Sequence, residues 1–171
     1  MAEFFLFQKR YDDALKKYKE ILEKDDHDGY VFRGLVNAFR GAGRKTEGEA
    51  YLKEYEEKFQ RTPTVWYGLG YLYYLENRNA EAEEALDRAL KADPENPLAL
   101  NNLGAVMARK KQFAKAIPLV KSAIKNNPQE LMFFRNLQKI YREMEDEQRF
   151  SSEFEVYKKE GPATIAAGYG K

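Results

Sequence analysis

The chain has 171 residues, of which 43% are apolar and 33% are charged, a balance typical of a folded protein with solvated helix faces. Its 29 Lys and Arg residues against 28 Asp and Glu residues give a net charge of +1, without the basic excess expected of a nucleic-acid binder. The absence of cysteine excludes disulfides, thiolate zinc sites and cysteine nucleophiles. No apolar stretch reaches the roughly 18 residues of a transmembrane helix.

The N-terminal segment, Met1 to Arg10, lacks the features of a signal peptide. An apolar patch occupies Phe4–Phe7, but no basic region precedes it. The compartment therefore stays open between the cytoplasm, which we favour, and the periplasm, which would apply if a signal peptide had been removed.

The first 62 residues are predicted to form one partial and one complete helix pair. Residues 1–28 are expected to hold the end of a first helix and a whole second helix, with Ala2, Phe5, Ala14, Tyr18 and Ile21 in register. Residues 29–62 form a degenerate unit whose two helices are separated by the turn Gly41–Gly43. Val36 stands where a small residue is usual, and we expect Gly48 on the opposing helix to make room for it.

Residues 63–96 carry the clearest pattern. The spacings of Trp66, Leu69, Gly70 and Tyr73 predict one helix, and those of Ala82, Leu86 and Ala89 predict a second. The polar segment Glu76–Asn79 is expected to form the turn between them. Gly70 and Ala82 are small where the two helices should cross, and Pro94 ends the second helix.

Residues 97–130 repeat this pattern at a distance of 34 residues. Leu69, Gly70, Ala82, Ala89 and Pro94 recur as Leu103, Gly104, Ala116, Ala123 and Pro128. A fixed period of this size marks stacked helix pairs, each of which buries its apolar face against its neighbours. Pro118 falls inside the predicted helix Phe113–Lys125, where we expect a mild bend.

The pattern fades again toward the C-terminus. Residues 131–162 are predicted to be a degenerate repeat or a capping helix pair, with Phe134, Leu137, Tyr141 and Phe154 in register. Gln138 and Phe150 occupy the two places where small residues are usual, so we expect this helix pair to splay. Residues 163–171 lack periodicity and are predicted to be a flexible tail.

The unit 63–96 resembles the tetratricopeptide repeat (TPR), a helix–turn–helix unit of 34 residues, at Trp66, Leu69, Gly70, Tyr73, Ala82, Ala89 and Pro94. The resemblance implies an all-α fold, a right-handed superhelical solenoid of antiparallel helix pairs. It also implies a non-enzymatic protein-binding scaffold, in which the first helix of each repeat lines a concave groove.

Many of the groove positions implied by the resemblance hold aromatic, polar or cationic residues. We predict partner binding at Arg33, Asn37, Arg40, Tyr67, Tyr71, Tyr74, Asn101, Arg109, Arg135, Lys139 and Arg142. The expected ligand is a peptide or protein segment with acidic groups or a free C-terminal carboxylate. The alternative is that the tyrosines pack against neighbouring helices and the basic side chains are merely solvated. Gly68, Leu98 and Asn102 replace residues of the family's carboxylate clamp, so we do not predict chaperone-tail binding.

No pattern in the chain indicates catalysis, a metal site or a cofactor. His27 is the only histidine, and a solvated loop explains its neighbours Asp25, Asp26 and Asp28, because the spacing of a calcium loop is missing. Gly41–Gly43 is not a phosphate loop, because these glycines follow a helix and not a strand. We therefore predict no enzyme activity, no cofactor and no small-molecule substrate.

Three functional hypotheses follow. The leading one is a scaffold that organises a multiprotein complex. The second is self-assembly into homo-oligomers, with Phe4–Phe7 at one end of the chain and Phe150, Phe154 and Tyr157 at the other as contact surfaces. The third is RNA binding, as in other helical-hairpin repeats, which the neutral charge and the Gly/Ala crossing disfavour.

Overall fold

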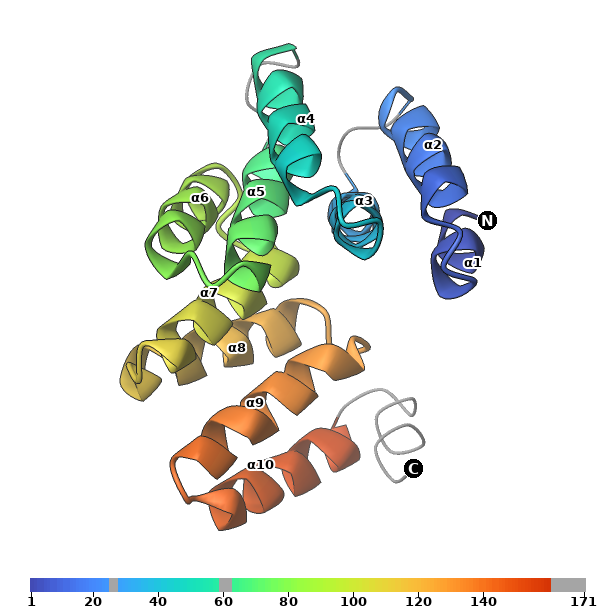
Figure 1. The fold of residues 1–171 in the computed structure, drawn as a ribbon. Helices are drawn as coiled ribbons and strands as arrows, with labels where there is room; N and C mark the ends of the chain where they lie inside the picture. The colour runs from blue at the N-terminus through green and yellow to red at the C-terminus, as the bar shows by residue number, and fades with distance from the viewer. Residues whose placement is uncertain (25–27, 59–62, 161–171) are drawn as a thin grey trace. The chain divides into compact units, whose positions relative to one another are not determined.

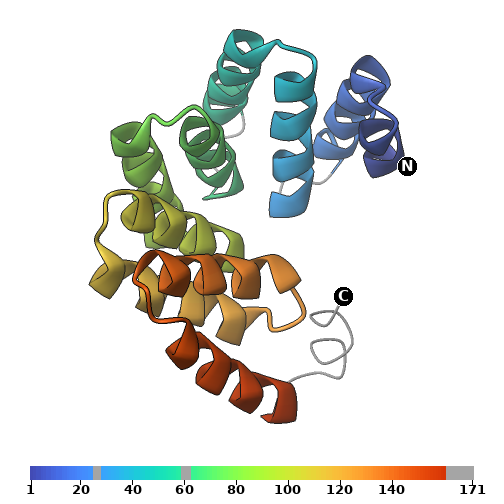
Figure 2. The same ribbon diagram turned by 60° about the horizontal axis from the view of Figure 1, so that its bottom comes forward.

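The computed structural model describes residues 1–24, 28–58 and 63–160, and all regular structure in these ranges is α-helical. The prediction of an all-α fold built from paired helices is confirmed (Figures 1 and 2). The chain divides into two compact units, Met1–Pro94 and Glu95–Lys171, which are described separately below.

The first unit contains three successive helix pairs. The helices are α1 (Ala2–Phe7), α2 (Tyr11–Leu22), α3 (Gly29–Gly41), α4 (Lys45–Lys58), α5 (Pro63–Leu75) and α6 (Asn79–Ala92). α3 packs against both α1 and α5, so the first helices of successive pairs lie side by side in this unit. The side chain of Asp28 caps α3 by accepting a hydrogen bond of 2.8 Å from the backbone N–H of Tyr30.

The second unit contains two helix pairs. Its helices are α7 (Pro97–Arg109), α8 (Phe113–Asn126), α9 (Leu131–Glu143) and α10 (Glu147–Glu160). Pro118 lies inside α8, as predicted. α7 begins with Pro97 in its first turn, and the side chain of Asn96 accepts a hydrogen bond of 2.9 Å from the N–H of Ala99.

The helices begin at the spacing of the sequence repeat. The second helices of the five pairs start at Tyr11, Lys45, Asn79, Phe113 and Glu147, each 34 residues after the one before. In the described ranges, no helix is long and apolar enough to cross a membrane.

One turn geometry joins the two helices of every pair. A residue in the left-handed region lies two positions before each second helix, and these residues are Lys9 (φ 59°), Gly43 (φ 73°), Asn77 (φ 61°), Lys111 (φ 59°) and Glu145 (φ 58°). The next residue donates its N–H to a carbonyl of the preceding helix, as Arg78 does to Tyr73 at 3.0 Å. This is the hydrogen bond of a Schellman motif, in which glycine is the most favoured residue at the left-handed position.

Glycines allow the closest approach inside the two regular pairs. A Cβ on Gly70 would lie 2.6 Å from Leu86 Cγ, and one on Gly104 would lie 2.5 Å from Val120 Cγ2. The crossing therefore brings Gly70 against Leu86, one turn along α6 from the predicted neighbour Ala82. Because glycine has no side chain at either crossing, α5 can pack closely on α6 and α7 on α8.

The degenerate pairs are looser. α3 contacts α4, and α9 contacts α10, less extensively than the helices of the two regular pairs contact each other, which confirms the expected splay of the last pair. The predicted fit of Val36 to Gly48 needs correction, because the nearest side chain to Gly48 is Phe39, 3.0 Å from an ideal Cβ. Tyr55 fills this wider pair: its ring meets Phe32 edge-on, and its hydroxyl donates to the Leu22 carbonyl at 2.9 Å.

The aromatic residues of α10 are core residues and not a contact surface. Phe150 and Phe154 are only 5% and 8% exposed, and their rings stack with centroids 5.5 Å apart. Phe134 of α9 lies edge-on against both Phe154 and Tyr157. The self-assembly hypothesis therefore loses the C-terminal half of its proposed interface, because these rings are used inside the second unit. The predicted tail at 163–171 lies outside the described residues.

Candidate interaction surfaces

The first unit brings together five of the predicted partner-binding residues on α3 and α5. Arg33, Asn37 and Arg40 lie on α3, and Tyr71 and Tyr74 lie on α5. The two helices approach closely where Gly68 faces Phe32, since an ideal Cβ on Gly68 would lie 3.1 Å from the Phe32 ring. We call this set of five side chains the α3–α5 face.

A hydrogen bond ties the two helices together at the centre of this face. The Tyr71 hydroxyl donates to Asn37 Oδ1 at 3.1 Å. Burial raises the pKa of Tyr71, and the Asn37 hydrogen bond and the charges of Arg33 and Arg40 partly offset that rise. Both guanidinium groups are thus close enough to act on Tyr71, so the face combines a half-buried polar pair with positive charge.

The cations of the face differ in their surroundings. Arg40 is exposed, and no carboxylate of the described chain lies within ion-pair distance of it. The Arg33 guanidinium lies over the ring of Tyr30, 4.8 Å from its centroid. Stacking of a cation on an aromatic ring reduces its conformational freedom.

Tyr67 does not belong to the exposed face. Its side chain is 1% exposed, and its ring stacks on Tyr71 with centroids 6.2 Å apart and an interplanar angle of 8°. The prediction that Tyr67 is available to a partner is therefore wrong, and the alternative that it packs inside holds for this tyrosine. The buried Tyr67 ring packs against Tyr71 and stabilises its position.

Asn101 in the second unit needs the same correction. It is fully buried, and its Oδ1 accepts a hydrogen bond of 2.8 Å from Asn136 Nδ2 while its own amide donates to Asn102 Oδ1 at 3.2 Å. A buried amide must find partners inside the protein, and here α9 supplies one. Asn101 links α7 to α9 and cannot reach a ligand.

The four predicted cations of the second unit are exposed, but two of them have acidic neighbours. Lys139 Nζ lies 4.0 Å from Glu143, and Arg142 Nε lies 3.3 Å from Glu147. Arg109 and Arg135 are also exposed. The positive bias expected from the sequence is therefore weaker here than at the α3–α5 face, since Glu143 and Glu147 lie beside two of the cations.

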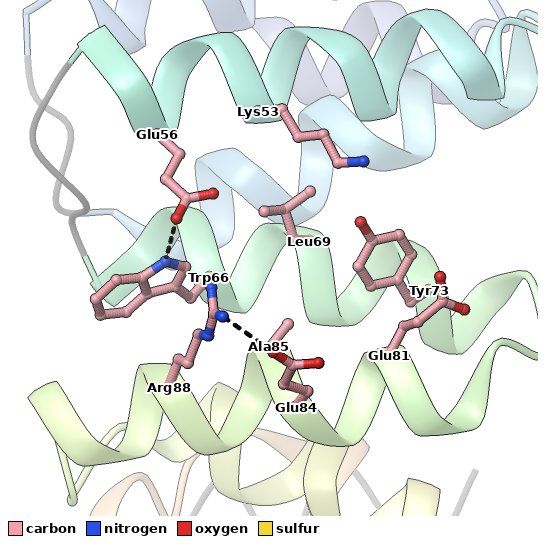
Figure 3. A pocket seen from close by; sticks show the side chains of 9 residues that line it. All are labelled: Lys53, Glu56, Trp66, Leu69, Tyr73, Glu81, Glu84, Ala85 and Arg88. Atoms are coloured by element: carbon pink, nitrogen blue, oxygen red, sulfur yellow. Dashed lines mark hydrogen bonds and ion pairs between the residues drawn. The ribbon is translucent and has the colours of Figure 1, made fainter.

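Sequence reasoning missed a cleft between α4 and α6 whose floor is α5 (Figure 3). Its volume is about 180 Å³, and its lining residues are Lys53 and Glu56 of α4, Trp66, Leu69 and Tyr73 of α5, and Glu81, Glu84, Ala85 and Arg88 of α6. A comparison of equivalent positions in successive repeats could have indicated this cleft. Tyr51 and Tyr55 fill the equivalent space between α2 and α4, and alanine stands 34 residues later at Ala85 and Ala89.

Glu49 is the centre of a polar cluster at one end of this cleft. Its carboxylate pairs with Arg78 at 2.6 Å and Lys53 at 2.8 Å, and it accepts a hydrogen bond of 3.1 Å from the Tyr73 hydroxyl. These partners, with the Arg78 hydrogen bond as the largest effect, lower the pKa of Glu49 to about 2. Arg78 also pairs with Glu81, so the cluster links α4 to the start of α6.

The described residues contain no group of three or more His, Cys, Asp and Glu side chains that could hold a metal ion. The loop cluster considered from the sequence, Asp25, Asp26 and His27, lies outside the described residues. Asp28 is described, and its carboxylate caps α3.

Successive antiparallel helix pairs, a shared left-handed turn and a 34-residue period define a helical-repeat protein of the TPR type. Residues 33–97 and 76–130 match the sequence model of the tetratricopeptide repeat. Because these matches cover more than half of the chain, the chain belongs to the TPR family, as its sequence predicts. TPR proteins are in general protein-interaction scaffolds without catalytic activity.

Known proteins share the fold and part of the sequence. "ER membrane protein complex subunit 2-A" of Xenopus laevis is 32% identical over 92 residues, which are 54% of this chain and 31% of the frog protein. The chain thus spans about a third of the length of this curated relative. TTC0263, a thermophilic TPR protein of Thermus thermophilus, superposes with a TM-score of 0.71 at 16% identity, over 98% of this chain and 93% of that chain. YrrB, a TPR protein described as having an unusual peptide-binding site, superposes with a TM-score of 0.62 at 16% identity, over 98% and 84% of the two chains.

Proposed function

We propose that the α3–α5 face binds an acidic segment of a partner protein, and that the chain uses this contact to organise a multiprotein complex. The observation that carries the proposal is the hydrogen bond of Tyr71 on α5 to Asn37 on α3, the helix that also bears Arg33 and Arg40. The peptide-binding site named for YrrB and the membership of the curated relative in a protein complex are consistent with this reading.

Each side chain has a distinct role in the proposal. Arg33 and Arg40 pair with carboxylates of the segment, because guanidinium groups form the strongest side-chain hydrogen bonds to carboxylates. The Asn37 amide offers donors to backbone carbonyls of the segment, and the Tyr71 and Tyr74 rings contact its apolar side chains. Charge complementarity would then set the association rate and the choice of partner more than the final affinity.

The experiment is a titration with two short acetylated peptides, one that alternates glutamate with leucine and one that alternates glutamine with leucine. The double variant Arg33→Glu/Arg40→Glu should weaken binding of the acidic peptide by at least about tenfold, since each lost charged hydrogen bond is worth about 1.5–3 kcal/mol. The control is Lys45→Glu/Lys91→Glu, which makes the same charge change at exposed lysines of the same unit, outside this face.

The control variant should bind the acidic peptide within about twofold of the wild type at physiological salt, because exposed charges outside the site are screened within about 8 Å. If both double variants lose affinity equally, binding depends only on net charge and the proposed face is wrong. Equal binding of the glutamine peptide would refute the acidic ligand.

Self-assembly remains a second candidate function, because apolar side chains are exposed at the N-terminal helix. Met1 is 83% exposed, Phe4 56% and Phe7 87%. Light scattering after size-exclusion chromatography at several concentrations tests it. A concentration-dependent dimer that Phe4→Ser/Phe7→Ser abolishes would support self-assembly, and a monomer throughout would remove it.

A further inference from the structure

The α4–α6 cleft opens beside a small residue of α6, Ala85. One repeat earlier, Tyr51 lies under the Lys19 ammonium, 4.4 Å from its ring centroid, and Tyr55 bonds to the Leu22 carbonyl, so the space between α2 and α4 is filled. Ala85, which stands 34 residues after Tyr51, leaves that space open.

Trp66 is the residue that the change from Tyr51 to Ala85 leaves partly exposed. The equivalent residues in the other pairs are buried, with Phe32 and Phe134 fully enclosed and Leu100 only 7% exposed, whereas Trp66 is half-buried. Its ring edge, Leu69 and Ala85 form an apolar floor. The volume of about 180 Å³ is close to that of cavities that hold a benzene-sized group, about 150 Å³, so the cleft accepts one side chain and not a helix.

The charges at the rim decide which kind of side chain fits. Lys53 pairs with Glu49 at 2.8 Å, and Arg88 pairs with Glu84 at 2.9 Å, so both cations of the lining are neutralised. Glu81 pairs with Arg78. Glu56 accepts a hydrogen bond of 2.9 Å from Trp66 Nε1, and no cation of the described chain lies within ion-pair distance of its carboxylate (Figure 3).

We propose that the α4–α6 cleft binds a lysine or arginine side chain of a basic segment in a partner protein. The methylene stem of that side chain lies on Leu69 and Ala85, and its cationic group pairs with the Glu56 carboxylate beside the Trp66 ring. This site lies on a different side of α5 from Tyr71 and Tyr74, so the chain holds an acidic segment on one face and a basic segment on another. The two sites are independent, and either can fail alone.

Trp66 is the single tryptophan of the chain, so its indole N–H gives one resonance that reports on the cleft. The probes are acetyl-Ala-Xaa-Ala-amide tripeptides in which Xaa is arginine, lysine, citrulline or glutamate. Citrulline matches arginine in shape and lacks its charge. The arginine and lysine peptides should shift the indole resonance saturably in the millimolar range, and the citrulline and glutamate peptides should not.

Two variants test the assignment to this cleft. Glu56→Gln keeps an acceptor for Trp66 Nε1 but removes the charge, and it should weaken binding of the arginine peptide by about two- to fivefold. Ala85→Tyr restores the tyrosine of the preceding repeat and should abolish binding, whereas Ala80→Tyr, at an exposed position of the same helix outside the lining, should leave it unchanged. Unaltered binding of the arginine peptide by Glu56→Gln, or equal indole shifts with the citrulline peptide, would overturn the proposal. Glu56 lies outside the core, so the Glu56→Gln result does not depend on how well Ala85→Tyr folds.

Discussion

The left-handed turn residues predict opposite changes in the free energy of unfolding for substitutions at two equivalent positions, Glu145 and Gly43. Glu145 adopts φ 58° in the turn between α9 and α10, where a non-glycine residue costs about 1–2 kcal/mol. Glycine would remove that cost but would lose about 0.5–1 kcal/mol through the greater freedom of its unfolded state. Glu145→Gly should therefore stabilise the protein by about 0.5–1 kcal/mol net.

Gly43 offers the reverse change at the equivalent place, 102 residues earlier in the chain (145 − 43). An ideal Cβ on Gly43 meets no atom within 4 Å, so Gly43→Ala changes only the backbone energy. It should destabilise by about 0.5–1 kcal/mol. Ala42→Gly is the matched control, because Ala42 has φ −74° and gains nothing from glycine, so this variant should be less stable than the wild type.

The assay is thermal unfolding followed by circular dichroism. A change of this size corresponds to about 2–8 °C in the midpoint for a unit of under 100 residues. The midpoint should rise for Glu145→Gly and fall for Gly43→Ala and Ala42→Gly. If Glu145→Gly instead lowers the midpoint as Ala42→Gly does, the five turns do not share the strain that their dihedral angles indicate.

Three further changes have expected outcomes of known direction. Gly104→Ala should destabilise by about 1–2 kcal/mol in urea titrations, because overpacking against Val120 and the Ala116 carbonyl outweighs the better helix propensity of alanine; no loss would mean that α8 shifts freely. Glu49 has a folded-state pKa of about 2, below its ordinary value of 4.5, so its stabilisation should be complete above about pH 5 and be lost as the pH falls toward 2. Glu49→Gln should remove that part of the pH dependence of the thermal midpoint, and an unchanged slope would contradict the assignment. Tyr71→Phe deletes the hydrogen bond to Asn37 and should cost about 0.5–1.5 kcal/mol of unfolding free energy, whereas a neutral effect would indicate that the bond adds no net stability.

The period of the sequence was sufficient to predict the helix pairs, because helix starts depend on local signals that recur with it. Gly70 and Gly104 marked the tight crossings, and Gln138 and Phe150 marked the looser last pair. The turns were harder to predict, since the same left-handed geometry holds glycine at one position and lysine or glutamate at others. Propensity alone would not place Lys111 or Glu145 there.

The binding residues were predicted less well, because a position in the repeat does not fix how deeply its side chain is buried. Tyr67 and Asn101 occupy equivalent positions, and both are enclosed: Tyr67 stacks on Tyr71, and Asn101 is bonded to Asn136. The cleft was missed for the opposite reason. It arises from a difference between repeats, the change from Tyr51 to Ala85, which the positions shared by the repeats do not reveal.

Mapping of backbone amide shifts during titration with the glutamate–leucine peptide tests directly whether the α3–α5 face recognises acidic segments. We expect the largest shifts on α3 and α5 around Arg33, Asn37, Arg40, Tyr71 and Tyr74, and we expect Arg33→Glu/Arg40→Glu to remove them. Shifts of equal size with the glutamine–leucine peptide, or shifts centred on other helices, would contradict it.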